Sequence, residues 1–501
     1  MAVLKYNNLH STYFDLGLFL QNLSQIASGE WSRVFLSHIQ PLIAFWSVVY
    51  IFPSEEIIAF LVLVMQAGFL ALPFIGIYLY FGVIPSLAFF LFFPLWYNSL
   101  SDFHIDHLAV PILFAIFFFE RLEKNKLVLL FGFLLPLVKE VFALQTVFLG
   151  LYLILKKTHL REGLILIFYG VIFFFIAHEY IQGYFSAPLS FEIGGTNMIS
   201  AANSPFGWLG SNIKEVIIFL ITQPHIVIFE ILTNKDKVLY MLYLFGALGF
   251  IPLLSPKTLV VAAPILAIAL LSNLPNHHSY VHHYTAGLIA PMVVAFSEGL
   301  PRAKKLFEKL NFRQELFYPI IILGLFISHC LLSPSPIGRK FFLEKSWNYH
   351  YSIYLPSNRD AMIKEALLKT IPKDPKLIIS IQNSLVFNSI LQRKIIFPFP
   401  DGVKEKAIGV HTSDLSWDGF LRYVVQGTLD VKPLKEYLAD YIVLDLKRPW
   451  FITDRSCHWL RGRCLNDLAF ETEFLGLVES SHKYFKTVFE SDGFMILKRR
   501  E

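Results

Sequence analysis

The sequence predicts an α-helical polytopic membrane protein with roughly ten spans and added interfacial helices, followed by a soluble α/β domain. Hydrophobic residues make up 55% of the 501 residues and charged residues only 16%, well below the share typical of soluble chains. Phe alone contributes 50 residues. This composition disfavours a secreted enzyme, a disordered chain and a soluble nucleic-acid-binding protein, so no nucleic-acid partner is expected.

The apolar residues are concentrated in the first two thirds of the chain. Long apolar runs begin at Ile57, Phe81, Leu127, Gly163, Val238, Thr258, Thr285 and Phe317, and a shorter run covers 107–119. A membrane-spanning helix needs about 20 such residues. After Leu332 charged residues and short β-rich runs return. We therefore predict a membrane domain over residues 1–332 and a soluble domain over 333–501.

Basic residues beside the apolar runs predict the orientation, because short cytoplasmic loops are rich in Lys and Arg. They gather in four connections, which contain Lys124 and Lys126; Lys156, Lys157 and Arg161; Lys257; and Arg302, Lys304, Lys305, Lys309 and Arg313. Placing these inside puts 99–106, 182–214, 273–283 and the C-terminal domain outside. The protein is then a multi-pass protein of the cell membrane.

The N-terminal segment is polar and has no signal-peptide pattern. The predicted topology leaves it outside. Either a preceding transmembrane helix is missing, which we favour, or 38–52 inserts as an extra span.

Ionisable residues near membrane depth are costly, so they indicate functional sites. Asp15 precedes an apolar stretch, where it is either a helix N-cap or a catalytic carboxylate. A second group follows in Ser101-Asp102-Phe103-His104-Ile105-Asp106-His107. The two imidazoles and two carboxylates of this stretch could hold a divalent cation, with Asp102, His104 and His107 as the candidate ligands selected, or they cap the helix and are solvated at the interface.

Lys139-Glu140 divides the apolar stretch 127–155 into two half-spans that meet at this pair. The pair is either an internal salt bridge or the start of a phosphate site, since a buried lysine binds phosphate strongly. Four His also occur within 277–283, directly before Tyr284. They favour metal binding, acid–base chemistry or phosphate contact, or form an interfacial belt without chemistry.

Several short motifs carry a family resemblance. They are Phe14-Asp15-Leu16-Gly17-Leu18-Phe19, His38 with Pro41, Asp102-Phe103-His104, Leu108-Ala109-Val110-Pro111, Leu137-Val138-Lys139-Glu140, Leu253-Leu254-Ser255-Pro256, His283-Tyr284 with Pro291, and Ala439-Asp440-Tyr441-Ile442-Val443-Leu444-Asp445. In this order the chain resembles the polytopic bacterial and archaeal proteins called domain of unknown function 2079.

That family resembles the GT-C glycosyltransferases, which take sugars from polyprenyl-phosphate carriers at the outer membrane face. The resemblance implies that Asp15 is a general base or metal-binding carboxylate. It also places Asp102, His104, Lys139, Glu140 and His283 on polar positions of the family. The family often has carboxylates where this chain has Leu20 and Val141, which weakens a metal-dependent mechanism.

The C-terminal region reads as α/β, with strands at 376–381, 394–397 and 441–446, a helix at 383–391, and a hairpin formed by 484–490 and 493–498. No Gly-rich phosphate loop occurs there. Its suggested role is to bind an acceptor or to cover a polar cavity.

Three functional hypotheses follow. In the first, a glycosyltransferase, Asp15 deprotonates the acceptor hydroxyl, while His38, Lys139, Glu140, His282, His283 and Tyr284 bind a polyprenyl-phosphate-linked sugar donor. A divalent cation is its only expected cofactor, membrane lipids are expected partners, and the acceptor is unknown. The second is a transporter or flippase for a lipid or anionic solute that uses the same residues. The third is a non-catalytic membrane scaffold.

Overall fold

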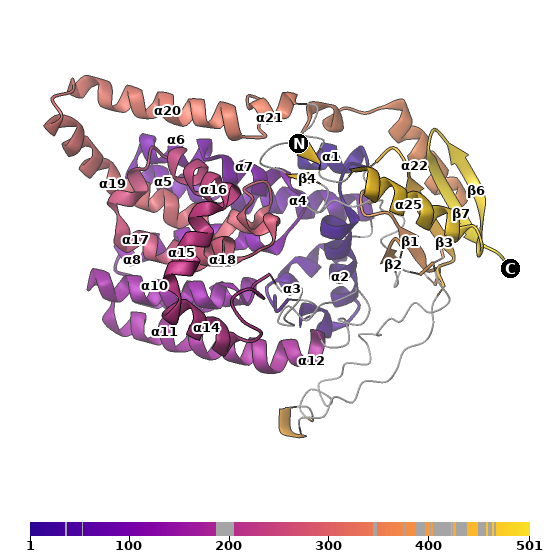
Figure 1. Ribbon diagram of the computed structural model, residues 1–501, viewed down its shortest axis with the longest axis horizontal. Coiled ribbons are helices and arrows are strands. Elements are labelled where there is room, and N and C mark those ends of the chain that lie inside the picture. The colour runs from indigo at the N-terminus through magenta and orange to yellow at the C-terminus, as the bar shows by residue number, and fades with distance from the viewer. Residues whose placement is uncertain are drawn as a thin grey trace.

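The computed structural model describes residues 1–35, 38–52, 54–186, 205–343, 348–374, 376–386, 396–400, 402–403, 422, 424–426, 438–448, 457–458, 463–464 and 467–501. Most of these residues are helical, and a small sheet lies at one end of the molecule (Figure 1). The predicted combination of a mainly helical body with a C-terminal α/β region is confirmed.

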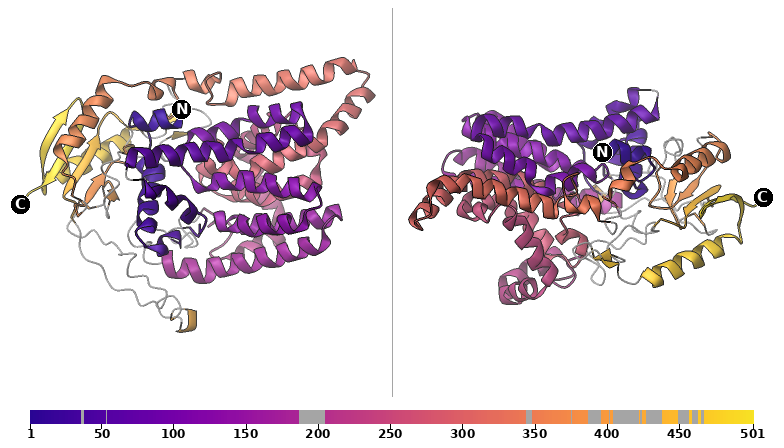
Figure 2. Two further views of the ribbon diagram at one scale, coloured as in Figure 1. Left: turned by 180° about the vertical axis from the view of Figure 1, so that it is seen from behind. Right: turned by 90° about the horizontal axis from the view of Figure 1, so that it is seen from above.

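The helical body is a bundle whose long helices run side by side (Figure 2). Its helices are α4 (Glu55–Ala71), α5 (Pro73–Phe81), α6 (Val83–Leu91), α7 (Phe93–Leu100), α8 (Ala109–Arg121), α9 (Asn125–Val138), α10 (Phe142–Lys156), α11 (Leu160–Phe175), α12 (Gln182–Ser186), α14 (Ile213–Thr222), α15 (Pro224–Thr233), α16 (Lys235–Gly246), α17 (Pro256–Leu259), α18 (Ala263–Leu271), α19 (Ala286–Lys309) and α20 (Phe317–Leu332). Many apolar side chains on α11, α15 and α20 are exposed, as expected of helices that face lipid.

Within the described ranges, three helices are long and apolar enough to cross a membrane: Ile57–Phe81, Leu160–Ile181 and Gln314–Leu332. Two bent pairs, Val83–Leu91 with Phe93–Leu100 and Ile213–Thr222 with Pro224–Thr233, raise the number to five at most. The predicted count of roughly ten spans is not confirmed. Several apolar runs form shorter helices. A 14-residue helix such as α9 is about 21 Å long at 1.5 Å per residue, less than the hydrocarbon thickness.

The break predicted at Lys139-Glu140 is present. α9 ends at Val138, Lys139 has extended backbone angles, and α10 begins at Phe142. The two helices contact each other, so the chain turns back at this point. The alternative span at 38–52 is not formed, because this stretch contains only the short helices α3 (Ile43–Trp46) and η3 (Ser47–Ile51).

α14 and α15 meet at an angle of 89° and project from the bundle in the right-hand view of Figure 2. Pro224 lies at the first position of α15, where its missing N–H costs no helical hydrogen bond. A pair bent this sharply cannot cross a membrane as one straight rod, which agrees with the prediction of interfacial helices.

α19 is the central helix of the bundle. All of its residues from Ala286 to Ser297 are buried. Gly287 and Gly299 allow close packing, since a Cβ on Gly299 would lie 2.5 Å from the Ile251 carbonyl oxygen. The first turn of α19 directly follows the histidine-rich segment that ends at Tyr284.

The C-terminal region contains a five-stranded sheet in the order β2-β1-β3-β7-β6. Its strands are β1 (Ile379–Ile381), β2 (Ile396–Pro398), β3 (Tyr441–Asp445), β6 (Phe485–Ser491) and β7 (Phe494–Arg499). β1 is parallel to β2 and β3, while β6 and β7 form the predicted antiparallel hairpin. The predicted strands are thus confirmed over 379–381, 396–397 and 441–445 and in the hairpin, whereas 376–378 are not in a strand and 394–395 lie outside the described residues. Residues 383–386 are not helical, and 387–391 lie outside the described residues.

The N-terminal segment, with α1 (Ala2–Asn7), the π-helical turn η1 (Tyr13–Gly17) and α2 (Leu18–Ala27), lies between the bundle and the sheet (Figure 1). The sheet docks on it through main-chain contacts. The Tyr13 N–H donates to the Asn383 carbonyl oxygen at 2.9 Å, and the Tyr13 hydroxyl lies 2.8 Å from the Ile396 carbonyl oxygen. Asn383 and Ile396 belong to the loop after β1 and to β2. One hydrophobic cluster includes side chains from both regions, and the domain boundary at 332/333 stays a prediction.

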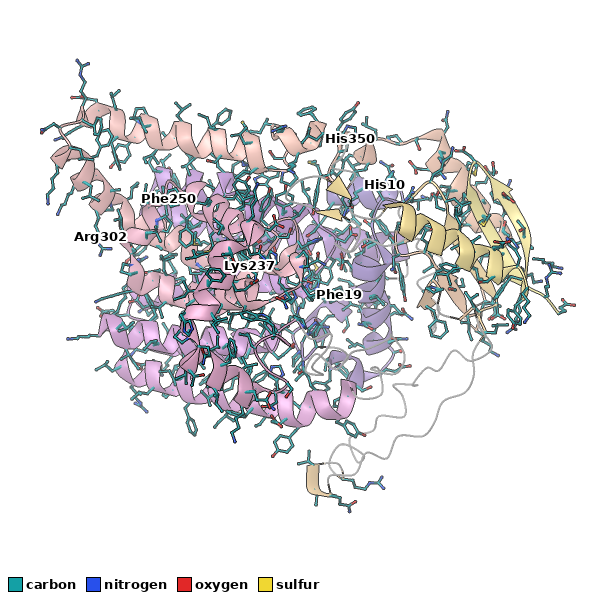
Figure 3. All side chains as sticks on the ribbon, in the orientation of Figure 1. His10, Phe19, Lys237, Phe250, Arg302 and His350 are labelled. Carbon is teal, nitrogen blue, oxygen red and sulfur yellow. The ribbon has the colours of Figure 1, made fainter. Side chains whose placement is uncertain are left out.

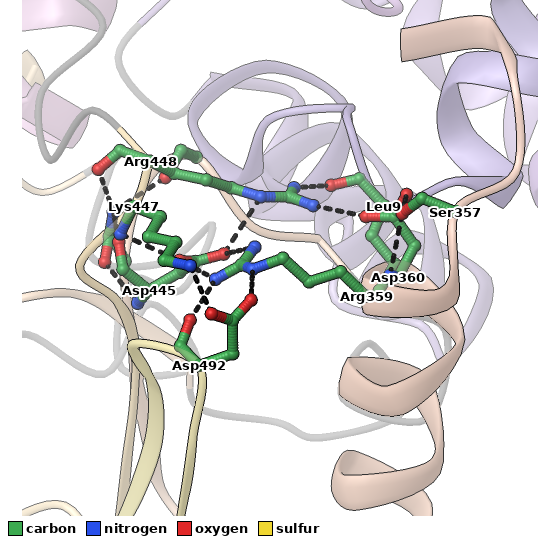
Figure 4. A network of polar contacts seen from close by, with 10 residues as sticks. Leu9, Ser357, Arg359, Asp360, Asp445, Lys447, Arg448 and Asp492 are labelled. Atoms are coloured by element: carbon green, nitrogen blue, oxygen red, sulfur yellow. Dashed lines mark hydrogen bonds and ion pairs between the residues drawn. The ribbon is translucent and has the colours of Figure 1, made fainter. Parts of the chain in front are cut away.

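A charged network strengthens this docking (Figure 4). Arg448 follows β3, donates to the Leu9 carbonyl oxygen and pairs with Asp360 at 2.9 Å. Arg359 of α22 (Asn358–Thr370) binds both carboxylate oxygens of Asp445, at 2.6 and 2.9 Å. This network joins the start of the chain, α22 and the carboxyl end of β3.

A separate ion network lies at the other end of the bundle, where α8 and α10 end. It consists of Glu120, Arg121, Lys156 and Glu298, and we name it the distal ion network. Lys156 Nζ lies 3.4 Å from Glu120 and 3.2 Å from Glu298, which also pairs with Arg121. In Figure 3 Arg302, one turn beyond Glu298 on α19, is far from Phe19.

Candidate functional site

The polar residues singled out in the sequence come from four separate stretches, and most converge where the N-terminal segment meets the bundle. These stretches are η1, the 3-10 turn η4 (Ile105–Leu108) with the residues before it, the break between α9 and α10, and the segment before α19. The outer polar cluster, as we name it, contains Asp15, His104, Asp106, Lys139 and His283. Phe19 borders it, with its ring 5.0 Å from that of His104.

Asp15 lies inside η1, and its side chain caps neither η1 nor α2. In the described part of the chain its carboxylate has no hydrogen-bond or ion-pair partner. Burial is the main cause that raises the pKa of Asp15, and the negative charge of Asp102 adds to it. The helix-cap interpretation is therefore not supported. The remaining interpretation is a functional carboxylate with a raised pKa.

Asp102 has a structural partner. Its carboxylate lies 3.0 Å from Lys5 Nζ and accepts a 2.6 Å hydrogen bond from the Thr12 N–H. The Lys5 and Asp102 side chains are only 1% and 3% exposed. This buried ion pair fixes the chain just before η1, so Asp102 helps to position Asp15 and is not placed among the possible cation ligands.

His104, Asp106 and His283 form the metal-capable group of the described residues. Their ligand atoms all lie within 4.8 Å of one another. The two imidazole rings stack with centroids 3.3 Å apart. His104 Nδ1 and Asp106 Oδ2 are in close contact, yet both atoms are buried and neither has a hydrogen bond of acceptable geometry. Two potential ligand atoms that face each other without a hydrogen bond are better suited to binding a divalent cation than to binding each other.

The protonation states agree with this donor set. Burial lowers the pKa of His104 and holds the pKa of His283 well below its usual value, so both imidazoles are neutral. Burial alone would raise the pKa of Asp106, but Lys139 and His104 outweigh it and hold that pKa well below its usual range. Two neutral imidazoles and an ionised carboxylate are suitable ligands for a divalent transition metal.

His107, which the sequence placed with His104, lies elsewhere. Its Nδ1 contacts the His104 carbonyl oxygen, and its ring packs against Trp46 and Phe103 with centroids 5.3 and 5.4 Å apart. Burial lowers the pKa of His107 to about 4. Because the 3-10 turn directs its ring into an aromatic cage, His107 does not join His104 at one face.

Lys139 and Glu140 do not pair with each other. Lys139 Nζ lies 3.4 Å from Asp106. The Glu140 carboxylate contacts His38 Nδ1 at 2.7 Å and accepts hydrogen bonds from the Ile39 N–H at 2.9 Å and from Gln182 Nε2 at 3.3 Å. The two side chains at the break therefore point to different partners: Lys139 to the outer polar cluster, and Glu140 to the loop that contains His38.

The histidine-rich segment contributes several rings. Tyr284 lies 4.3 Å from His283 and 4.9 Å from His277 between ring centroids. Burial lowers the pKa of His277 to about 4, and the charges of Lys139 and His38 add to this effect. His282 acts electrostatically on Asp15. This segment therefore connects the Asp15 side of the cluster with the Lys139 side.

Sequence reasoning missed Lys5 and did not select Asp106. Asp106 is one of the two carboxylates of the stretch considered for a cation, but Asp102 was chosen as the ligand in its place. Lys5 gave no signal, because its partner Asp102 is 97 residues away along the chain. Only tertiary packing brings these two side chains together.

The fold and the cluster define a helical membrane protein with ionisable groups gathered beside a docked α/β sheet. The chain belongs to the DUF2079 family, described as predicted membrane proteins, whose model matches residues 5–409. This confirms the resemblance seen in the short motifs.

Two solved structures resemble the chain. They are ArnT from Cupriavidus metallidurans bound to undecaprenyl phosphate, at 12% identity and a TM-score of 0.43, and the same protein in the apo state, at 11% and 0.44. Each alignment covers 99% of this chain and 95% of the other. Likeness of this degree does not establish a shared fold. No curated protein matches the chain in sequence.

Proposed function

We propose that this protein is a membrane glycosyltransferase that moves a sugar from a polyprenyl-phosphate carrier to an acceptor hydroxyl at the outer membrane face. The observation that carries the proposal is the Asp15 carboxylate, which is unpartnered among the described residues and has a raised pKa, beside the lysine and histidines of the outer polar cluster. General bases are tuned in this way by burial.

In this mechanism Asp15 accepts the proton of the acceptor hydroxyl. The acceptor oxygen bonds to the anomeric carbon of the sugar, and the bond from that carbon to the carrier phosphate oxygen breaks. The bonding electron pair stays on the phosphate. No nucleotide is needed, because the leaving group is a lipid phosphate.

Lys139 is the proposed phosphate-binding residue. Its side chain is 8% exposed, and a charge at this depth acts more strongly than one in water. His282 acts electrostatically on Asp15, and Lys139 acts on His283, so we propose that His282, His283 and Tyr284 bind the sugar. The DUF2079 motifs include Asp15, Lys139, His283 and Tyr284.

His104, Asp106 and His283 would hold a divalent cation, which would supply Lewis-acid stabilisation of the departing phosphate. Asp106 would then face this cation and Lys139 together. An anionic phosphate would balance the added positive charge, so the donor set and the proposed substrate are mutually consistent. Asp102 and His107, predicted as ligands, would support the site through Lys5 and the aromatic cage.

The basic residues support the proposed outer location. Arg121, Lys156 and Arg302 are at the far end of the bundle from the outer polar cluster, where α8 and α10 end. By the positive-inside rule, this distribution favours an outer position for the cluster and for the C-terminal sheet.

The test is mass spectrometry of lipids that copurify with detergent-extracted protein, in wild type and in Lys139→Ala. We expect a polyprenyl phosphate, with or without sugar, in wild type and its depletion in the variant. Lys156→Ala is the matched control, because Lys156 also pairs with buried carboxylates but lies in the distal ion network. Ordinary phospholipids alone in all three proteins would overturn the proposal and favour transport assays in vesicles.

A further inference from the structure

We propose that His38, oriented by Glu140, is the acid that protonates the departing carrier phosphate. The inference rests on the proposed glycosyl transfer and assigns a second proton-transfer group to it. Glu140 is a positioning residue in this scheme, and His38 is the group that touches the substrate.

The geometry fixes the ring of His38. Glu140 Oε1 lies 2.7 Å from His38 Nδ1, and Glu140 Oε2 accepts the N–H of the next residue, Ile39, at 2.9 Å. The carboxylate therefore contacts both the imidazole and the backbone N–H of the next residue. With Nδ1 donating to a carboxylate, the second nitrogen, Nε2, is left for another partner. The same arrangement orients the histidine of hydrolase triads.

A positioning carboxylate should be buried and a proton-donating imidazole should be accessible, and the exposure of the two side chains follows this order. Glu140 is 6% exposed, whereas His38 is 27% exposed. Gln182 Nε2 adds a third hydrogen bond to the carboxylate at 3.3 Å. Glu140 is thus held by three donors that come from the His38 loop and from α12, while the imidazole keeps an accessible edge.

His38 also lies on the phosphate side of the site. Glu140 directly follows Lys139, and the charges of both Lys139 and His38 act on His277. Asp15, in contrast, is coupled to His104, His282, Asp102 and Lys5. In this scheme Asp15 is the base and His38 is the acid, and the partner of His38, Glu140, adjoins Lys139 in the break between α9 and α10.

The proton balance is complete. Asp15 gains the acceptor proton and His38 Nε2 gives its proton to the phosphate oxygen that leaves the anomeric carbon. The carrier departs as a singly protonated phosphate monoester, and His38 is recharged from solvent through its exposed edge. The Glu140 carboxylate holds His38 Nδ1 at 2.7 Å, which orients Nε2 for this transfer.

Farnesyl phosphate, a short polyprenyl phosphate, tests the scheme on the detergent-solubilised full-length protein. Its affinity is measured by isothermal titration calorimetry from pH 5.5 to 8, and its protonation by the ³¹P chemical shift of the bound phosphate. Loss of one charge-assisted hydrogen bond predicts about 10- to 100-fold weaker binding for His38→Gln at neutral pH. We expect Glu140→Gln to weaken binding less than His38→Gln does, because it keeps the imidazole and removes only the carboxylate that orients it. The pH profile of the ³¹P shift should change more in His38→Gln than in Glu140→Gln.

His225→Gln is the control, since His225 is an exposed histidine of α15 with no role in the site. Thermal melting curves establish that each variant is folded. If farnesyl phosphate binds wild type and His38→Gln with the same affinity and the same ³¹P titration, the role of His38 is refuted while the phosphate site stands. If wild type itself fails to bind farnesyl phosphate, both the proposed function and this inference fall.

Discussion

The outer polar cluster and the distal ion network occupy opposite ends of the same bundle and satisfy their charges differently. In the distal network two carboxylates face two cations, and Tyr152, Thr158 and Thr258 donate further hydrogen bonds to these carboxylates. Within the described ranges, Arg121 Nη1 is buried without a hydrogen bond. In the outer polar cluster Asp15 has no partner among the described residues, and buried donor atoms of His104 and Asp106 are unsatisfied. Charges are common to both, but only one end leaves them available to a ligand.

The difference has a physical basis. A buried charge is tolerated when a partner and hydrogen bonds compensate for lost hydration. The distal network meets this condition for both of its carboxylates, while Arg121 Nη1 lacks a hydrogen bond in the part of the chain that the structure describes. The outer polar cluster meets it only partly, which is typical of sites whose missing partner is a substrate or cation. The predictions below test this contrast.

The largest expected effect is on catalysis at Asp15. Asp15→Asn should reduce transfer of label from radiolabelled polyprenyl-phosphate sugar to membrane acceptors by about 10²- to 10⁴-fold, because it removes the general base. Glu298→Gln, at the distal end, is the comparison variant and should keep most of the rate. Full activity of Asp15→Asn would remove Asp15 from the mechanism.

Metal binding should depend on the outer end alone. His283→Ala should weaken Zn²⁺ binding, followed by calorimetry, by more than about 100-fold, since even indirect ligand support is worth about 10- to 100-fold. His107→Phe should preserve the affinity, because His107 packs in an aromatic cage away from the group. An equal loss in both variants would instead favour the ligand set predicted from the sequence.

Stability should depend more on the distal network. Glu298→Gln leaves Arg121 and Lys156 without one of their carboxylates, and we expect it to lower the free energy of unfolding by about 1–3 kcal/mol. The side chains of Glu298, Arg121 and Lys156 are partly exposed, so the expected loss of stability is smaller than for a fully buried ion pair. Chemical denaturation in detergent measures the loss. A variant as stable as wild type would show that this network contributes no net stability.

The pH dependence of Asp15 should separate function from stability. Its raised pKa means that the ionised form is unfavourable in the folded protein, so Asp15→Asn should be more stable than wild type at neutral pH. That advantage should fade as the pH falls through the raised pKa of Asp15 toward the ordinary carboxyl value. The transfer rate of wild type should fall over the same range. If the transfer rate of wild type fell only near the pKa of an ordinary exposed carboxyl group, the raised pKa of Asp15 would be contradicted.

The smallest effect is expected where the sheet docks. Tyr13→Phe removes the hydroxyl that lies 2.8 Å from both Gln21 Oε1 and the Ile396 carbonyl oxygen. We expect a loss of about 1 kcal/mol, the usual net value of one hydrogen bond, and a matching fall in the melting temperature. A large loss of transfer at unchanged stability would show that docking of the sheet also controls the position of Asp15.

Much of the fold could be predicted because local patterns determine it. The break at Lys139-Glu140 and the hairpin of β6 and β7 follow from charge and turn residues. The count of spans could not be predicted in this way. Apolar runs of similar composition form long helices in one place and short, buried helices in another, depending on their neighbours.

For the site, the sequence by itself determined which ionisable residues are candidates: Asp15, His104, Lys139, Glu140 and the histidines before α19. Such groups are costly beside apolar runs, so their presence is informative without a structure. Only the tertiary structure decided their partners. It joined Lys5 to Asp102, Glu140 to His38, and Asp106 to His104 and His283. These contacts span from a few residues to more than half the protein's membrane region, and no sequence spacing specifies them. They arise because helices that bury their apolar faces bring particular polar turns together.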